Sequence, residues 1–132
     1  MEIEAMAVTV VELNYEQDES LEHQSATATL ELKRPAFDSA APIPITEMTI
    51  NSFVEGHLVV DATGDGFELS TEISGLFRLF EGDYEDLNRG PESVVEDILA
   101  ILMDKFKFYY ATFSQEATGI IIFPEVDVQI AP

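Results

Sequence analysis

The sequence predicts an α+β domain in which a curved, antiparallel four-stranded sheet is covered on one side by a long C-terminal amphipathic helix. Three observations support this prediction. Apolar and polar residues alternate through much of the first 80 residues, as they do in strands with one buried face. An Asp-Gly pair separates the two longest alternating segments, as in a hairpin. After residue 92 the apolar residues recur every three or four positions, which is typical of a helix.

The length and the charge of the chain restrict what it can be. A chain of 132 residues favours one domain, spanning 1–132, and its 46 % apolar and 24 % charged residues are typical of a folded protein. The 26 acidic residues outnumber the 6 basic ones, for a net charge of −20. This charge opposes direct binding to nucleic acids and to anionic membrane surfaces. Three explanations of the acidity stay open: a self-repelling soluble surface, adaptation to high salt, or attraction of basic partners.

Several features concern the cellular compartment. The chain has no cysteine, which excludes disulfides, thiolate metal sites and cysteine nucleophiles. It contains no apolar run long enough to span a bilayer, and its first residues, Met1 to Glu4, lack the pattern of a signal peptide. We therefore expect a cytoplasmic protein without membrane insertion.

The alternating part of the sequence predicts four strands, at about residues 6–15, 25–34, 46–61 and 66–80. In the first of them the alternation changes phase between Val10 and Val11, which indicates a bulge or a strand covered on both faces. Pro35 ends the second strand, because proline has no N–H for a sheet. Residues 35–45 contain three prolines and predict an extended loop or a crossing at the sheet edge.

The hairpin formed by the third and fourth strands is the clearest local prediction. Asp65 and Gly66 suit the positive backbone angles of a tight turn. The acidic residues here superficially resemble a calcium loop, but the bidentate glutamate of an EF-hand is missing, so the hairpin turn is favoured. Gly56 and Gly75 lie inside the two strands and indicate bulges or close contacts with another backbone.

The last third of the chain predicts a helix. Residues 81–91 form a polar connector, and the helix spans about 92–116, with Pro91 and Glu92 suited to its first turn. Residues 120–130 are apolar at even positions and contain a proline. They predict an extended apolar segment that lies beside the helix.

No pattern in the sequence indicates catalysis. His23 and His57 are the only histidines and do not form a close pair that would seed a zinc site. The Gly-x-Ser-x-Gly motif of a nucleophilic serine is absent, and the glycines at 64 and 66 are not followed by the Lys-Ser/Thr of a phosphate loop. We predict no catalytic residues, no metal site and no cofactor, so the protein is not expected to be an enzyme. His57 is expected at the surface.

The aromatic residues are the candidates for a binding site. They are concentrated late in the chain, and residues 106–110 are apolar nearly all around one helical turn. A helix that is apolar on two sides is buried against its own sheet and against something else. The alternative is that the extra aromatics only complete the core. The candidates for an oligomer seam or a groove for apolar polypeptide are Phe77, Phe106, Tyr109, Tyr110, Phe113 and Phe123.

The order of the elements, over about residues 7–130, resembles the SecB family of export chaperones and its SecB-like relatives. Three short motifs carry the resemblance: Gly75-Leu76-Phe77, Ile98-Leu99-Ala-Ile-Leu102, and Ile122-Phe123-Pro124-Glu-Val126-Asp127. Two features depart from the family. The helix lacks the Phe-Pro-Tyr step followed by an arginine, and no C-terminal helix and tail for engaging the SecA motor follow residue 130. The departures put coupling to the translocase in doubt.

The resemblance implies a homo-oligomer, a dimer or a dimer of dimers, with apolar grooves that hold unfolded polypeptide without ATP. The function predicted is therefore an ATP-independent, holdase-type chaperone whose acidic surface keeps it soluble and attracts basic clients. Two other classes stay open. One is a structural assembly protein, such as a small viral or phage component of a ring or shell. The other is an acidic mimic of nucleic acid.

Overall fold

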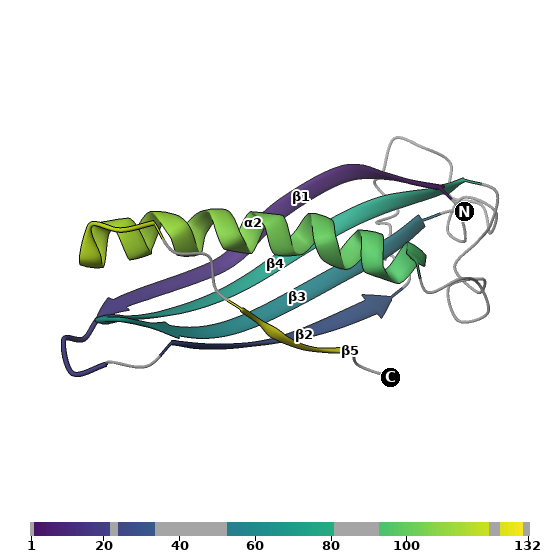
Figure 1. The fold of residues 1–132 in the computed structure, drawn as a ribbon. Coiled ribbons are helices and arrows are strands. Elements are labelled where there is room, and N and C mark those ends of the chain that lie inside the picture. Colours follow the sequence, from purple (N-terminus) through teal and green to yellow (C-terminus); the bar gives the residue numbers. More distant parts are fainter. Residues whose placement is uncertain (1, 22–23, 34–52, 81–92, 122–124, 131–132) are drawn as a thin grey trace.

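The computed structural model describes residues 2–21, 24–33, 53–80, 93–121 and 125–130 (Figure 1). In chain order the elements are β1 (Glu2–Gln17), β2 (Ser25–Lys33), β3 (Phe53–Gly64), β4 (Phe67–Phe80), α2 (Ser93–Thr118) and β5 (Asp127–Ile130). The strands form one sheet in the order β1-β4-β3-β2-β5. All neighbours in it are antiparallel except β2 and β5, which are parallel.

The sheet has five strands and not the four that the sequence predicts. The additional strand, β5, belongs to the segment that was expected to lie beside the helix. It pairs with β2, with Ala28 opposite Val128 and Leu30 opposite Ile130. An edge strand such as β2 presents unpaired N–H and C=O groups, and β5 provides partners for them.

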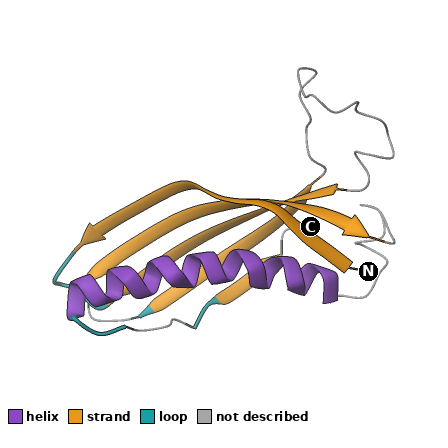
Figure 2. Ribbon diagram, turned by 90° about the horizontal axis from the view of Figure 1, so that it is seen from above, coloured by secondary structure: helices purple, strands orange, loops and turns teal. Residues whose placement is uncertain are grey.

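Helix α2 runs lengthwise over one face of the sheet, so the domain has two layers (Figures 1 and 2). The core lies between these layers because the strands alternate between buried and exposed residues. The other face of the sheet carries no helix among the described residues. The largest fully buried side chains are Tyr110, Phe67, Phe77, Phe106, Leu30 and Leu58.

Strand β1 is curved and contains two bulges (Figure 2). The pairing with β4 shifts between Val10 and Glu12, which confirms the bulge predicted from the change of phase at Val11. A second shift, between Ala5 and Ala7, was not predicted. Each bulge adds one residue to β1 and increases its bend.

The turn between β3 and β4 confirms the predicted hairpin. Gly66 has a φ of +84°, which glycine adopts without a steric cost. The loop that follows β1 is attached to this turn. The Asp18 N–H donates to the Gly66 carbonyl, and the Gly66 N–H donates to the Leu21 carbonyl, each at 2.9 Å.

Helix α2 extends two residues beyond the predicted end at residue 116 and stops before Gly119, whose φ is +79°. The Ser114 hydroxyl, which is buried, donates to the Ile120 carbonyl at 3.0 Å and so holds the chain after the helix in place. The connector predicted at 81–91 lies outside the described residues, as do residues 46–52 of the predicted third strand.

A candidate polypeptide-binding groove

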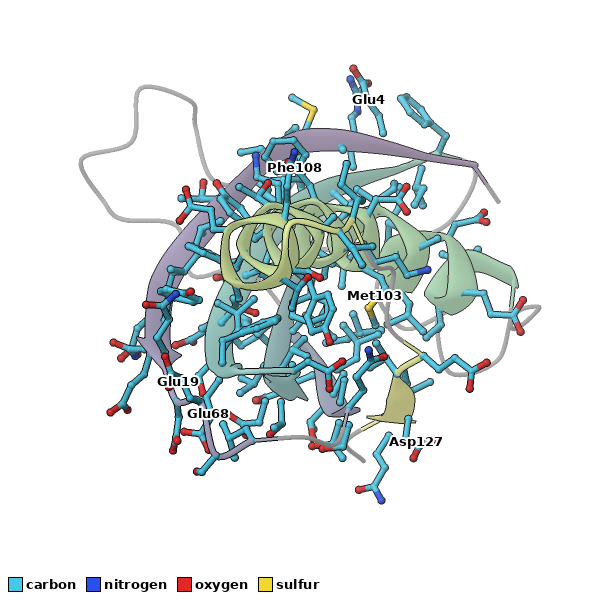
Figure 3. The ribbon with its side chains drawn as sticks, turned by 60° about the vertical axis from the view of Figure 1, so that its left-hand side comes forward. Glu4, Glu19, Glu68, Met103, Phe108 and Asp127 are labelled. Carbon is cyan, nitrogen blue, oxygen red and sulfur yellow. The ribbon has the colours of Figure 1, made fainter. Side chains whose placement is uncertain are left out.

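An open groove of about 520 Å³ lies between α2 and the segment that contains β5. We call it the α2–β5 groove. Its floor is apolar. On the helix side Met103 is buried in the core and points from α2 toward β5 (Figure 3). The other floor residues are half-buried: Leu99 on α2, and Val126 and Val128 on the facing segment.

The rim of the groove is acidic. Glu96, Asp104 and Lys107 come from one flank of α2, and Glu125 comes from the segment opposite. Positions 96, 100 and 104 are four residues apart, so Glu96, Ala100 and Asp104 follow one another along the same side of the helix. None of the four charged side chains makes an ion pair with another described residue. Three carboxylates and one ammonium group are therefore available to a ligand.

Strand β5, whose Val128 lines the groove, is the last strand of the described sheet. Figure 1 shows β5 at the margin of the sheet, beside β2. Within the described ranges no strand pairs with its other edge. Because N–H and C=O groups along a strand point alternately to its two sides, this edge presents hydrogen-bonding groups without a sheet partner.

A second apolar surface lies on the opposite flank of the helix, at β1. Phe108 is 66 % exposed and projects over β1, and Met6 and Val11 are more than half exposed on β1 itself (Figure 3). A cavity of about 520 Å³ lies beside Phe108, with Val8 and Ile101 in its lining. We call the surface formed by Val8, Ile101 and Phe108 the β1–Phe108 strip.

The structure places the described aromatic candidates in different surroundings. Phe77, Phe106 and Tyr110 are at most 1 % exposed and belong to the core under α2. Tyr109 and Phe113 are half-buried, and Phe113 stacks on Tyr15 of β1 with ring centroids 4.3 Å apart. Phe123 lies outside the described residues.

Sequence reasoning did not assign the groove residues. Leu99 and Met103 belong to the predicted apolar side of the helix, and the even-numbered apolar residues of the last segment include Val126 and Val128. The sequence therefore identified both groups of apolar residues. It did not show that the helix residues and the residues of the last segment face each other across a groove. That contact depends on β5 pairing with β2, a strand about 100 residues earlier in the chain.

The sheet face without the helix carries polar side-chain contacts among the described residues. His57, expected at the surface, is half-buried there and hydrogen-bonds Glu55 at 2.9 Å, and the Ser70 hydroxyl donates to Asp61 at 2.9 Å. The described part of the chain contains no group of three or more histidine or carboxylate side chains arranged to hold a metal ion.

Comparisons with known proteins give matches in structure only. No family model and no curated protein matches the sequence. A crystal structure of a protein of unknown function from Streptococcus agalactiae matches with a TM-score of 0.61 at 16 % identity, covering 95 % of this chain and 98 % of that one. The SecB-like chaperone Rv1957 of Mycobacterium tuberculosis, solved in complex with a ChAD peptide from the HigA1 antitoxin, matches with a TM-score of 0.54 at 14 % identity, covering 93 % of this chain and 88 % of that one.

The fold resembles that of a SecB-like chaperone. This agrees with the resemblance seen in the order of the sequence elements, and the likeness extends over almost the whole of both chains. At such low identity it shows the fold alone. No helix among the described residues is long and apolar enough to cross a membrane.

Proposed function

We propose that this protein is an ATP-independent chaperone that holds non-native polypeptide in the α2–β5 groove. The observation that carries the proposal is the groove itself, with an apolar floor, an acidic rim and a free strand edge. The SecB-like fold supports it, because the Mycobacterium tuberculosis protein of that fold is bound to a peptide. We also propose that the protein is cytoplasmic and acts by binding, not by catalysis.

The chemistry of the groove suits this task. Unfolded segments expose apolar side chains, and burying each one on the floor contributes about 1.5–3 kcal/mol. The carboxylates of Glu96, Asp104 and Glu125 attract cationic segments over a longer range. The remaining negative charge of the chain keeps a loaded complex from associating with other complexes.

Suppression of client aggregation tests the proposal. Val128→Asp places a charge on the groove floor at a half-buried position, so the variant is expected to fold but to lose at least about tenfold in affinity for an unfolded client. The matched control is Val59→Asp, because Val59 is 44 % exposed on the sheet face without the helix. Equal loss in both variants, or no suppression by the unsubstituted protein, would contradict the proposal.

We further propose that the β1–Phe108 strip contacts a second copy of this chain. Strand β1 has 16 residues and lies at the edge of the sheet that the described strands form. An edge strand with exposed apolar side chains is prone to pair with another chain, and two copies related by a twofold axis pair such an edge antiparallel. Native mass spectrometry is expected to show a dimer or tetramer that gains the mass of an unfolded client. Phe108→Asp is expected to shift the protein toward the monomer.

The same measurement separates the other functional classes. A large closed particle that ignores the client would favour a structural assembly protein. A monomer that ignores the client and competes with DNA for a basic protein would favour a nucleic-acid mimic.

A further inference from the structure

The bulge at Val11 divides β1 into two parts that are held to β4 in different ways. In the part before the bulge, Glu4 is directly opposite Arg78, so the two side chains carry opposite charges. Val8 and Val10 of this part pack against the core. Both faces of the sheet therefore stabilise the pairing of this part with β4.

The part of β1 after the bulge brings like charges together on the sheet face without the helix. Glu12 is directly opposite Glu72, and Glu16 is directly opposite Glu68. None of these four carboxylates forms an ion pair with another described residue. A further carboxylate, Asp61 of β3, lines the same shallow hollow as Glu12 and Glu72. Directly opposite side chains have Cβ atoms about 4.5–5.5 Å apart, so each of the two pairs repels and weakens the pairing of this part with β4.

Two buried hydroxyl groups lie on the core face of the same region. The Tyr15 phenol oxygen and the Thr71 hydroxyl oxygen are buried and have no hydrogen-bond partner. Thr71 is directly opposite Leu13, which precedes Tyr15 by two residues on β1. A buried polar group without a partner has lost its hydrogen bonds to water, so both hydroxyls disfavour the closed structure.

Ring contacts and the loop that follows β1 oppose these effects. Tyr15 stacks on Phe113 with ring centroids 4.3 Å apart, and its ring centroid lies 5.9 Å from that of Phe67. The loop is attached to the β3–β4 turn by the two hydrogen bonds at Gly66. These contacts keep the closed structure the major state, and the two like-charge pairs and the two hydroxyls reduce its advantage.

We propose that residues 12–21 form a flap that opens at the Val11 bulge while the rest of the domain stays folded. A bulge interrupts the ladder of a strand pair, so one side of it can separate while the other stays paired. Opening moves the like charges apart, gives both hydroxyls access to water and uncovers the rings of Phe67 and Phe113. Aromatic side chains at this end of the core thereby become accessible without global unfolding. The flap does not depend on the proposed chaperone function, and its tests use the protein without a client.

Amide hydrogen exchange at neutral pH and low salt tests the flap. Among the β1 amides that bond to β4, those of residues 12–17 are expected to exchange at least about tenfold faster than those of residues 7–10, after correction for intrinsic rates. Urea below the unfolding transition is expected to accelerate them less than the amides of β3, because a local opening exposes less surface. Equal exchange on the two sides of the bulge, or the urea dependence of β3, overturns the proposal.

Variants on β4 test the causes of opening, because they leave the intrinsic exchange rates of β1 unchanged. Glu68→Gln/Glu72→Gln removes both like-charge pairs and is expected to slow exchange of residues 12–17 about threefold to tenfold. The matched control is Glu31→Gln/Asp127→Asn, which removes the same charge at exposed positions of β2 and β5 and is expected to leave this exchange unchanged.

Thr71→Val tests the contribution of the buried hydroxyls. It replaces the hydroxyl with a methyl group of similar size and is expected to slow exchange of residues 12–17 about threefold or more. An effect of Glu68→Gln/Glu72→Gln no larger than that of its control, or a Thr71→Val protein that exchanges as fast as the unsubstituted one, overturns the proposal.

The chain has no cysteine, which allows a second and independent test. Val10→Cys and Leu13→Cys each place one thiol at a half-buried position on the core face, before and after the bulge. A neutral maleimide is expected to label the Leu13→Cys protein at least about tenfold faster than the Val10→Cys protein, each relative to its own rate in denaturant. Equal relative labelling of the two thiols overturns the proposal.

Discussion

At the scale of single residues, two glycines allow α2 to approach the sheet. Gly56 and Gly75 are directly opposite each other on β3 and β4. A Cβ atom added at Gly75 would lie 2.7 Å from the Phe77 ring and 2.9 Å from Leu102 of α2. At Gly56 the nearest atoms would be 3.2 Å away, on Ile98 and Leu102. The close contact predicted for these glycines is therefore with side chains of the core and the helix, not with another backbone.

We predict that Gly75→Ala destabilises the protein by about 1–3 kcal/mol, the usual cost of overpacking a core. Phe77 is fully buried and has no space to move away from the added methyl group. Gly56→Ala is the matched control and is expected to cost less, because its contacts are longer. The free energy of unfolding in urea measures both. A Gly75→Ala protein as stable as the unsubstituted one would show that the helix can shift at no cost.

Tyr110 gives the stability of the protein a dependence on alkaline pH. Burial, and secondarily the charge of Asp65, raise the pKa of its phenol above the usual value of 10.0. The unfolded chain therefore loses this proton at a lower pH than the folded chain does. As pH rises above about 10, the unfolded state binds fewer protons, so the free energy of unfolding falls.

We predict that Tyr110→Phe reduces this alkaline loss of stability. The comparison is the change in the free energy of unfolding between pH 8 and pH 11 in the two proteins. Phe lacks the titrating group and keeps the ring contacts with Phe106 and Phe67. An identical pH dependence in both proteins would show that other groups control the alkaline transition.

The sequence predicted on which side of its strand or helix a residue lies. It did not predict whether that side is buried by the other layer of the domain. Alternation correctly identifies Phe77 as belonging to the same side of its strand as the other buried residues of β4. Helical spacing does the same for Phe106 and Tyr110. Neither period contains information on the distance between the two layers. The aromatics therefore fit a core and a groove equally well until the helix is placed.

At the scale of elements, β1 shows how an extra residue preserves a buried face. Val10 pairs with Ile73 and Leu13 pairs with Thr71, so both point to the core, although their spacing of three is wrong for a regular strand. The extra residue at Val11 corrects the spacing. Its side chain is 57 % exposed. The phase change in the sequence revealed this bulge. The bulge at Met6 was not visible because Ala5, Met6 and Ala7 are all apolar.

We predict that deleting Asn14 costs at least about 3 kcal/mol more than deleting Val11. Without Val11, β1 pairs regularly and both faces keep their residues. Without Asn14, the preceding residues move by one position, so Leu13 is exposed and Glu12 enters the core. Thermal unfolding of the two deletion variants measures the difference. Similar losses would mean that the bulge shifts to absorb the change.

The bounds and the pairing of some elements could be predicted from the sequence better than those of others. The hairpin and the helix depend on contacts close in sequence, and both were predicted to within a few residues of their ends at 64–67 and 118. Strand β5 has only four residues and pairs in parallel with a strand about 100 residues earlier. A pattern that short cannot choose its partner, so the fifth strand and the groove beside it required the structure.

At the scale of the whole molecule, the net charge of −20 acts on folding and on binding in opposite directions. Carboxylates repel one another most strongly in the compact state, so the charge destabilises the fold. The same charge attracts a cationic client. Salt screens both effects, because the Debye length falls from about 30 Å at 0.01 M to about 8 Å at 0.15 M.

We predict that raising sodium chloride from about 0.01 M to about 0.15 M increases Tm by about 4 °C or more, and that the same change weakens binding of a cationic unfolded client. Sodium thiocyanate at equal ionic strength is the control, because screening at these concentrations does not depend on the identity of the anion.

A constant Tm would show that the carboxylates are too far apart to repel one another. A Tm that continues to rise at molar salt, where screening is already complete, would favour adaptation to high salt as the origin of the acidity. A rise that ends near 0.15 M, together with weakened binding of the cationic client, would favour attraction of basic clients.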